Sequence, residues 1–191
     1  MNNDLYSFVF RGQIAQTAIN DNLRNTQSPR TELGDHIRRR LPLDQIEKNL
    51  VEAATNMAFV YTAIAAFENS ARKFIAERLL EEYEANWWDD KVSSAIKKQA
   101  EKRKADEANN RYHGSRGTSL IYYCQMGDLA SIINANEEAF TDYIPSTEWA
   151  RQIFKSIEMS RNVIMHSGQL SMNDIERVSM NIRDWVTQVG G

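Results

Sequence analysis

Apolar residues recur at steps of three and four across the long stretch between Gln45 and Tyr83, and neither proline nor glycine interrupts it. This spacing matches the turn of an α-helix, about 3.6 residues, and not the two-residue alternation of a strand. We therefore expect one long helix over residues 45–83, with room for a single break. The residues that share one face are Met57, Tyr61, Ile64, Glu68, Ala71 and Ile75.

The rest of the chain is also expected to be helical, because most of its three prolines and eight glycines fall where periodic patterns stop. Further helices are predicted at about residues 5–24, 89–110 and 118–134, the last with a possible break at Gly127–Asp128. The helix at 89–110 is polar on nearly all sides and should project into solvent. A chain of 191 residues fits one core. We place that domain at residues 41–191, with residues 1–40 as a helix and loop packed on it.

Two capping signals mark the last two helices. Ser146, after Pro145, is a suitable N-cap for a helix that should end near Ser167–Gly168. Its expected buried face carries Trp149, Ile153, Ile157 and Ile164. Ser171 and Asp174 have the spacing of a capping box and begin the final helix. The apolar residues that follow in three- and four-residue steps are Ile175, Val178, Ile182, Trp185 and Val189.

The net charge of −3 argues against a broad electrostatic grip on nucleic acid, so any RNA contact must be local. Basic residues do cluster, at Arg38–Arg40 and within residues 97–116, although a solvated surface is the simpler explanation of both clusters. The loop at 111–117 combines glycine with an aromatic and the three candidate RNA-binding residues Arg111, His113 and Arg116. A plain exposed turn is the alternative.

No apolar run approaches the roughly 20 residues that span a bilayer, and the first residues lack the pattern of a signal peptide. We expect a cytoplasmic protein without a membrane partner. The single cysteine, Cys124, lies in an apolar stretch and should be a buried, unreactive side chain. Because His36, His113 and His166 lie far apart in the sequence, we expect neither a metal site nor another cofactor.

Glu68 is the exception in the apolar stripe, and a carboxylate there needs a cationic partner. Arg72, one helical turn later, is one candidate, and an arginine from another helix is the other. Arg161 lies four residues after Ile157, at the border of a buried face, where a guanidinium favours a carboxylate. Its candidate partners are Glu68 and Glu158.

Asn162 and His166 lie four residues apart and so share a helix face, about 40° from each other. Arg161 and His166 are five apart, about 140° around an ideal helix, and would not converge on one atom. Either the helix breaks before His166, or a second copy of the segment completes the site. A purely structural alternative is an interior ion pair, with His166 only capping the helix.

The hexapeptide Arg161–His166 resembles the Arg-x4-His motif of HEPN ribonucleases, in which a polar residue follows the arginine. Residues 57–72 resemble the long central helix of one HEPN branch, which is named after the C-terminal domain of a eukaryotic nuclear mRNA-surveillance endonuclease and also occurs as free-standing bacterial proteins. The resemblance spans roughly residues 40–190. Other matching segments are Trp87–Trp88, Gly127–Leu129, Ser160–Gly168, Asp174–Arg177 and Arg183–Trp185.

The resemblance implies an all-α, HEPN-like helical bundle that forms a homodimer and cleaves RNA without a metal. His166 would then transfer the proton, Arg161 would bind the phosphate, and Asn162 would hydrogen-bond the phosphate or orient the imidazole. Glu68 and Arg72 would position Arg161 from behind. It also implies a toxin or phage-defence role, with an inhibitor or antitoxin as a possible partner. The alternative is a non-catalytic HEPN dimer that binds RNA or a partner protein.

Overall fold

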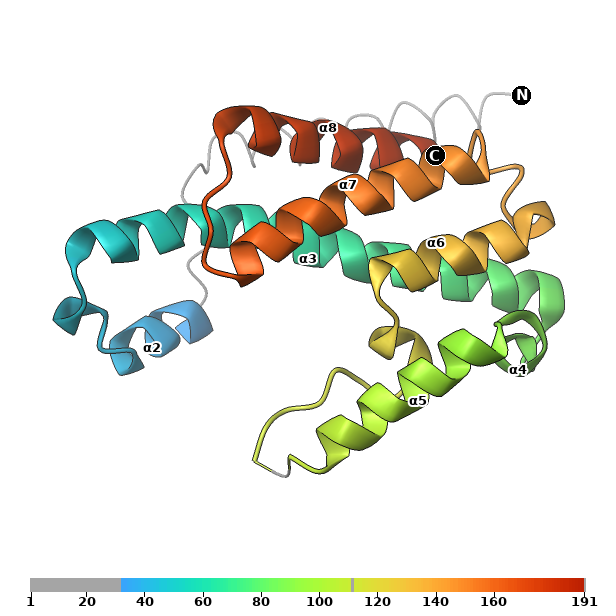
Figure 1. Cartoon of the computed structure of the whole chain (residues 1–191), viewed down its shortest axis with the longest axis horizontal. Helices are drawn as coiled ribbons and strands as arrows, with labels where there is room; N and C mark the ends of the chain where they lie inside the picture. The colour runs from blue at the N-terminus through green and yellow to red at the C-terminus, as the bar shows by residue number, and fades with distance from the viewer. Residues whose placement is uncertain (1–31, 111, 191) are drawn as a thin grey trace, which may run out of the picture. The chain divides into compact units, whose positions relative to one another are not determined.

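The computed structural model describes residues 32–110 and 112–190, and all regular structure within these ranges is helical (Figure 1). This confirms the expected all-α class. The predicted helix at residues 5–24 and the candidate Arg111 lie outside the described residues. The elements are α2 (Glu32–Arg40), η1 (Leu43–Gln45), α3 (Lys48–Tyr83), α4 (Trp87–Lys91), α5 (Ser94–Ala108), η2 (Leu120–Tyr123), α6 (Met126–Ala135), η3 (Glu137–Ala139), α7 (Thr147–Met165) and α8 (Met172–Val189), where η denotes a 3-10 helix.

The chain divides into two compact units, residues 1–51 and 52–191. In the first unit, α2 ends in the basic cluster Arg38–Arg40, whose side chains are exposed. The expected packing of residues 1–40 on a bundle stays a prediction. The second unit holds the hydrophobic core and every residue of the site described below.

The long helix α3 runs without a break over 36 residues, so the single break allowed by the sequence does not occur. It begins at Lys48 because the preceding 3-10 turn η1 ends at Gln45 and is followed by Ile46, whose backbone is extended. The expected stripe forms its buried face, with two exceptions: Tyr61 is more than a third exposed, and Glu68 is only partly buried. The buried residues of α3 are Met57, Ile64, Phe67, Ala71, Arg72, Ile75 and Leu79.

Trp185 of α8 lies at the centre of the core, with no exposed surface. Its ring stacks on Trp149 of α7, with centroids 5.8 Å apart and planes 6° from parallel. It also meets Phe67 and Phe74 of α3 edge-on, at 5.8 Å each. Large aromatic side chains bury more surface than any others, so this cluster ties α3, α7 and α8 together.

The expectation of one solvent-projecting helix at residues 89–110 is wrong. The helix is interrupted at Val92 and Ser93, where Ser93 caps α5 by accepting the Ile96 N–H at 3.4 Å. Arg103 of α5 donates to the Tyr123 carbonyl at 2.8 Å and pairs with Asp128 at 2.7 Å. A helix that is polar all round therefore packs on η2 and α6 through a long-range ion pair.

The helix predicted from Thr118 breaks earlier than expected. Gly127 lies in the first turn of α6, and the break falls at Cys124 and Gln125. The cause is Asp128, whose Oδ2 accepts the backbone N–H of Gln125 at 2.8 Å. This side chain satisfies a helix-start N–H that has no partner in the helix itself.

The other helix ends largely follow their sequence signals. Ser146 accepts the Trp149 N–H at 3.1 Å, and the Ser171 and Asp174 pair forms the predicted capping box. At the end of α7, however, Ser167 and not glycine takes the left-handed conformation, with φ of 62°. Gly168 follows, and a Cβ there would come within 2.7 Å of Val163 Cγ1. Residue 168 must therefore be glycine, because any Cβ would collide with Val163.

By length and composition alone, α3 could cross a membrane, although the sequence suggested no such segment. The indication is weak, because core helices of soluble proteins pass the same test. Exposed apolar side chains on this helix include Leu50 and Phe59.

We predict that Trp185→Ala lowers the free energy of unfolding by about 3–5 kcal/mol, because it removes the fully buried ring at the centre of the core. Val186→Ala is the matched control, because Val186 is the next residue on α8 and its side chain is mostly exposed. Urea denaturation followed by circular dichroism measures both variants. Equal midpoints for the two would contradict the assignment of Trp185 to the core.

Candidate functional site

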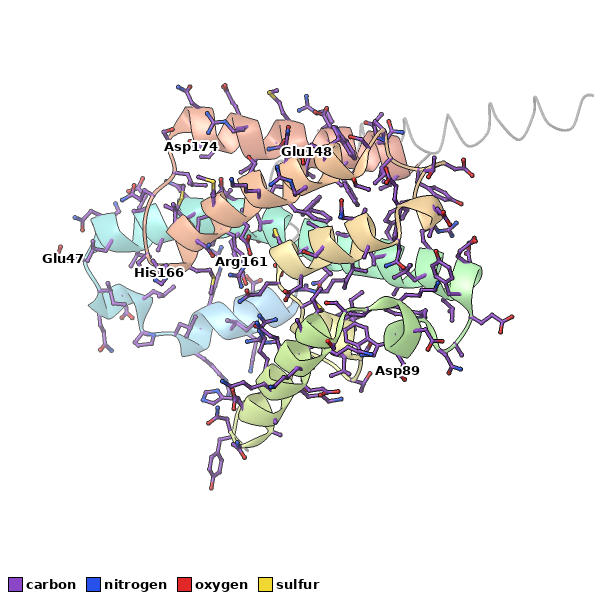
Figure 2. The ribbon with its side chains drawn as sticks, turned by 45° about the vertical axis from the view of Figure 1, so that its right-hand side comes forward. Glu47, Asp89, Glu148, Arg161, His166 and Asp174 are labelled. Carbon is purple, nitrogen blue, oxygen red and sulfur yellow. The ribbon has the colours of Figure 1, made fainter. Side chains whose placement is uncertain are left out.

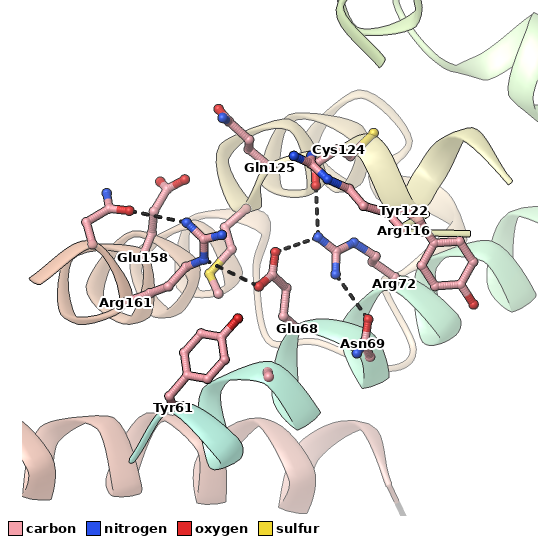
Figure 3. A pocket seen from close by; sticks show the side chains of 13 residues that line it. Tyr61, Glu68, Asn69, Arg72, Arg116, Tyr122, Cys124, Gln125, Glu158 and Arg161 are labelled. Atoms are coloured by element: carbon pink, nitrogen blue, oxygen red, sulfur yellow. Dashed lines mark hydrogen bonds and ion pairs between the residues drawn. The ribbon is translucent and has the colours of Figure 1, made fainter. Parts of the chain in front are cut away.

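A pocket of about 450 Å³ opens between α3, α7 and the segment around η2 (Figure 3). Its walls carry five of the candidate site residues predicted from the sequence, namely Glu68, Arg72, Arg161, Asn162 and the loop residue Arg116. The volume lies within the range of small-molecule sites, roughly 300–1,000 Å³.

Glu68 lies at the centre of an ion network on the pocket floor. Its Oε1 is 2.5 Å from Arg72 of the same helix, and its Oε2 is 3.7 Å from Nε of Arg161 on α7. The Glu68 side chain is only 13% exposed, so solvent screens these pairs little. The expected cationic partner is therefore present, and both candidates supply it.

Arg72 is buried and holds this floor in place. Besides Glu68, its guanidinium donates to the backbone carbonyl of Cys124 at 3.0 Å and to Asn69 at 3.2 Å. The bond to Cys124 joins α3 to the segment between η2 and α6 (Figure 3). Arg72 is thus a structural cation whose two terminal nitrogens are hydrogen-bonded by the protein, although its buried Nε has no hydrogen-bond partner.

Arg161 is engaged less completely. Its side chain is 35% exposed, and its Nε is a buried atom with no hydrogen-bond partner, because the Glu68 oxygen is too distant at 3.7 Å. A single weak bond of 3.4 Å joins it to Asn162. The alternative carboxylate, Glu158, lines the pocket, but no ion pair of the described residues joins it to Arg161. The guanidinium can therefore still bind an anion.

His166 does not line this pocket. It is the exposed residue that directly follows α7, and its backbone N–H donates to the Asn162 carbonyl at 3.1 Å (Figure 2). Because α7 stays helical through Met165, no break turns His166 toward Arg161. Within one copy the structure brings Arg161 and Asn162 together and leaves His166 outside.

The loop candidates separate as well. Arg116 lines the pocket with Arg161, whereas His113 lies in a second depression that also contains Lys104 and Ser115. Arg111 is outside the described residues, so its predicted role stays a prediction.

No local pattern in the sequence indicates the carboxylate that holds this loop. Glu107 of α5 accepts the Arg116 backbone N–H at 2.7 Å and the Tyr123 hydroxyl at 2.9 Å, and it pairs with Arg116 Nε at 3.2 Å. The N–H bond from Arg116 is the main cause that lowers the pKa of the Glu107 carboxyl. Burial, followed by the nearby Glu107, raises the pKa of Tyr123. Glutamates are common on exposed helices, so only the fold distinguishes this one.

Cys124 is buried, as expected, with 2% of its surface exposed. Burial, with a smaller contribution from Asp128, raises the pKa of its thiol to about 12. The thiol therefore stays protonated at neutral pH and is a poor nucleophile. Within residues 32–110 and 112–190, no group of three or more His, Cys, Asp or Glu side chains is placed to hold a metal ion.

We predict that Arg72→Met destabilises the fold by about 2–4 kcal/mol, because Glu68 loses its shortest ion pair and the Cys124 carbonyl loses its donor. The matched control is Lys73→Met, whose exposed ion pair with Glu77 contributes below about 0.5 kcal/mol. Chemical denaturation compares them. If Arg72→Met lowers the free energy of unfolding no more than Lys73→Met does, the result contradicts a structural role for Arg72.

We also predict that Cys124 in the folded protein does not react with a maleimide between pH 7 and 9, because its raised pKa and its burial both suppress the thiolate. Full labelling in denaturant provides the control. Rapid labelling of the native protein, measured by mass spectrometry, would contradict the buried placement.

The model of one protein family, described as Swt1-like HEPN, matches residues 62–190, well over half of the 191 residues. The match begins later than the resemblance noted in the sequence, but it includes α7 with Arg161 and His166. No curated protein and no solved structure matches the chain. The chain belongs to the Swt1-like HEPN family.

Proposed function

We propose that this protein is a metal-independent endoribonuclease. The observation that carries the proposal is the position of Arg161, whose incompletely bonded guanidinium lines a polar pocket beside Asn162. A planar guanidinium is well suited to bind the oxygens of a phosphodiester. Membership of the Swt1-like HEPN family supports the same reading.

Arg161 would bind the scissile phosphate and neutralise the charge that develops on it during reaction. Glu68 positions this guanidinium from behind at 3.7 Å, and Arg72 in turn fixes Glu68. Because the closest cation to Glu68 is Arg72, the carboxylate does not neutralise Arg161 fully. Asn162 would donate its amide hydrogens to the phosphate or fix the orientation of an imidazole.

His166 would reach the phosphate from a second copy of the chain. Met159, Val163 and His166 follow one another at steps of four and three, so they lie on the same side of α7, and none of the three lines the pocket. Met159 and Val163 are exposed apolar residues, and such surface is typical of a face that binds another protein. A homodimer through this side of α7 would bring each His166 toward the partner's Arg161.

The reaction uses the RNA's own 2′-hydroxyl as nucleophile. One histidine removes the proton from this hydroxyl, and the oxygen forms a bond to phosphorus while the bond to the 5′-oxygen breaks. The leaving 5′-oxygen takes up a proton from an imidazolium or from water. The products are a 2′,3′-cyclic phosphate and a 5′-hydroxyl, so DNA is not a substrate and chelators do not inhibit cleavage.

The biological role that we propose follows from the family by analogy. A ribonuclease that acts on cellular RNA needs restraint, which fits a toxin or phage-defence effector held by an inhibitor or antitoxin. The proposed partners are thus RNA, a second copy and such an inhibitor.

A second candidate function is a non-catalytic HEPN dimer that binds RNA or a partner protein. The position of His166 outside the pocket favours it, because in one copy no histidine lines the pocket beside Arg161. The experiment below separates the two functions.

We predict that the purified chain cleaves RNA in excess chelator, and that His166→Ala and Arg161→Ala each lower the rate at least about a hundredfold. His36→Ala is the matched control, since that histidine is exposed and belongs to the other unit. Gel analysis and mass spectrometry of the product ends measure the reaction. Residual cleavage that is equal in all variants would identify contamination and favour the binding dimer.

Mixing the two inactive variants tests the composite site. A dimer of one His166→Ala chain and one Arg161→Ala chain retains one intact arginine and one intact histidine on opposite copies. We expect the mixture to recover cleavage that neither variant shows alone. Failure to recover activity in confirmed mixed dimers would contradict a site built across two copies.

A further inference from the structure

The wall of the pocket beyond Arg72 carries Tyr122 and Arg116, which the proposed chemistry does not use (Figure 3). Tyr122 belongs to η2, and Arg116 belongs to the loop before it. Both line the same pocket as Arg161 and Asn162. Any extended ligand whose phosphate is held by Arg161 can therefore reach this wall.

The structure fixes Arg116 at this position. Glu107 accepts its backbone N–H at 2.7 Å and forms an ion pair with its Nε at 3.2 Å. The Arg116 side chain nevertheless remains 57% exposed. Binding by a preorganised cation costs less conformational entropy than binding by a free surface arginine.

Tyr122 is also held in place. Gly117 has a φ of 150°, and a Cβ on this residue would lie 2.9 Å from Cδ2 of the Tyr122 ring. The loop backbone thus packs directly against the tyrosine, which only glycine permits. Tyr122 is still 38% exposed and lines the pocket.

An aromatic ring beside a guanidinium is the combination that binds single-stranded nucleic acid, with the ring stacking on a base and the cation contacting the backbone. A duplex keeps its bases stacked on one another and cannot offer one to the ring. The net charge of −3 makes such a local contact more important, since general attraction to RNA is weak. Tyr112, by contrast, is fully exposed and does not line the pocket.

We propose that Tyr122 and Arg116 form a nucleotide subsite for single-stranded RNA, next to the phosphate held by Arg161. Tyr122 stacks on one unpaired base, and Arg116 contacts a neighbouring phosphate. The subsite rests on the proposed function and extends it. The RNA substrate must be unpaired at the nucleotide that contacts Tyr122 and Arg116.

Binding, measured without cleavage, tests the subsite. The full chain with His166→Ala keeps the RNA intact, and fluorescence anisotropy of a labelled oligouridine reports the affinity. Adding Tyr122→Leu weakens binding about tenfold, whereas Tyr122→Phe leaves it unchanged, because stacking needs the ring and not the hydroxyl. Tyr112→Leu, the matched control, has no effect. Equal affinity for the Tyr122→Leu and Tyr122→Phe variants overturns the proposal.

Two further measurements separate stacking from a change in folding. Gly117→Ala, which displaces the Tyr122 ring, weakens binding as Tyr122→Leu does, while the circular dichroism spectrum stays unchanged. An oligomer with abasic positions binds equally to the chains with and without Tyr122→Leu, because it has no base to stack. A persistent difference with the abasic oligomer, or equal affinity for duplex and single-stranded RNA, overturns the subsite.

Cleavage and binding can fail separately. If His166→Ala has no effect on cleavage but Tyr122→Leu still weakens binding, the nuclease proposal falls and the subsite stands. If cleavage depends on His166 but oligouridine binding is insensitive to Tyr122, the subsite falls and the nuclease stands.

Discussion

One carboxylate connects the fold of this protein to its site. Glu68 is nearly buried on α3, and a lone charge there would be costly. Arg72 offsets that cost from the same helix, and Arg161 approaches from α7. Since Arg72 also donates to the Cys124 carbonyl, three segments meet at this point. The charge requirement of Glu68 thus fixes where the pocket lies and which guanidinium faces it.

Much of the frame follows from local sequence signals. The three- and four-residue repeat of α3, the Ser146 cap and the box at Ser171 depend only on neighbours within one or two turns, and the structure confirms them. Glu68 could be identified as needing a cation because a carboxylate inside an apolar stripe conflicts with its surroundings. The sequence did not decide between two partners, and the structure uses both.

Other features depend on contacts that no local pattern encodes. The polar helix α5 packs on the fold because Arg103 meets Asp128, 25 residues away in the chain. Glu107 holds the loop through Arg116 and the buried Tyr123, which lie 9 and 16 residues away from it in the chain. Tyr122 reaches the pocket only because Gly117 lets the loop pass close to its ring. The role of a side chain that contacts another helix or loop can be recognised only when the positions of both elements are known.

The separation of Arg161 from His166 is itself a consequence of helix geometry. Residues five apart point about 140° away from each other, and α7 remains helical up to the residue before the histidine. A single copy therefore presents the proposed phosphate-binding cation and the proposed proton-transfer group to different sides. If two copies pair along the exposed apolar side of α7, each His166 points away from the Arg161 of its own copy and toward the Arg161 of the other copy. The same geometry would keep a lone copy inactive, so assembly would control the chemistry.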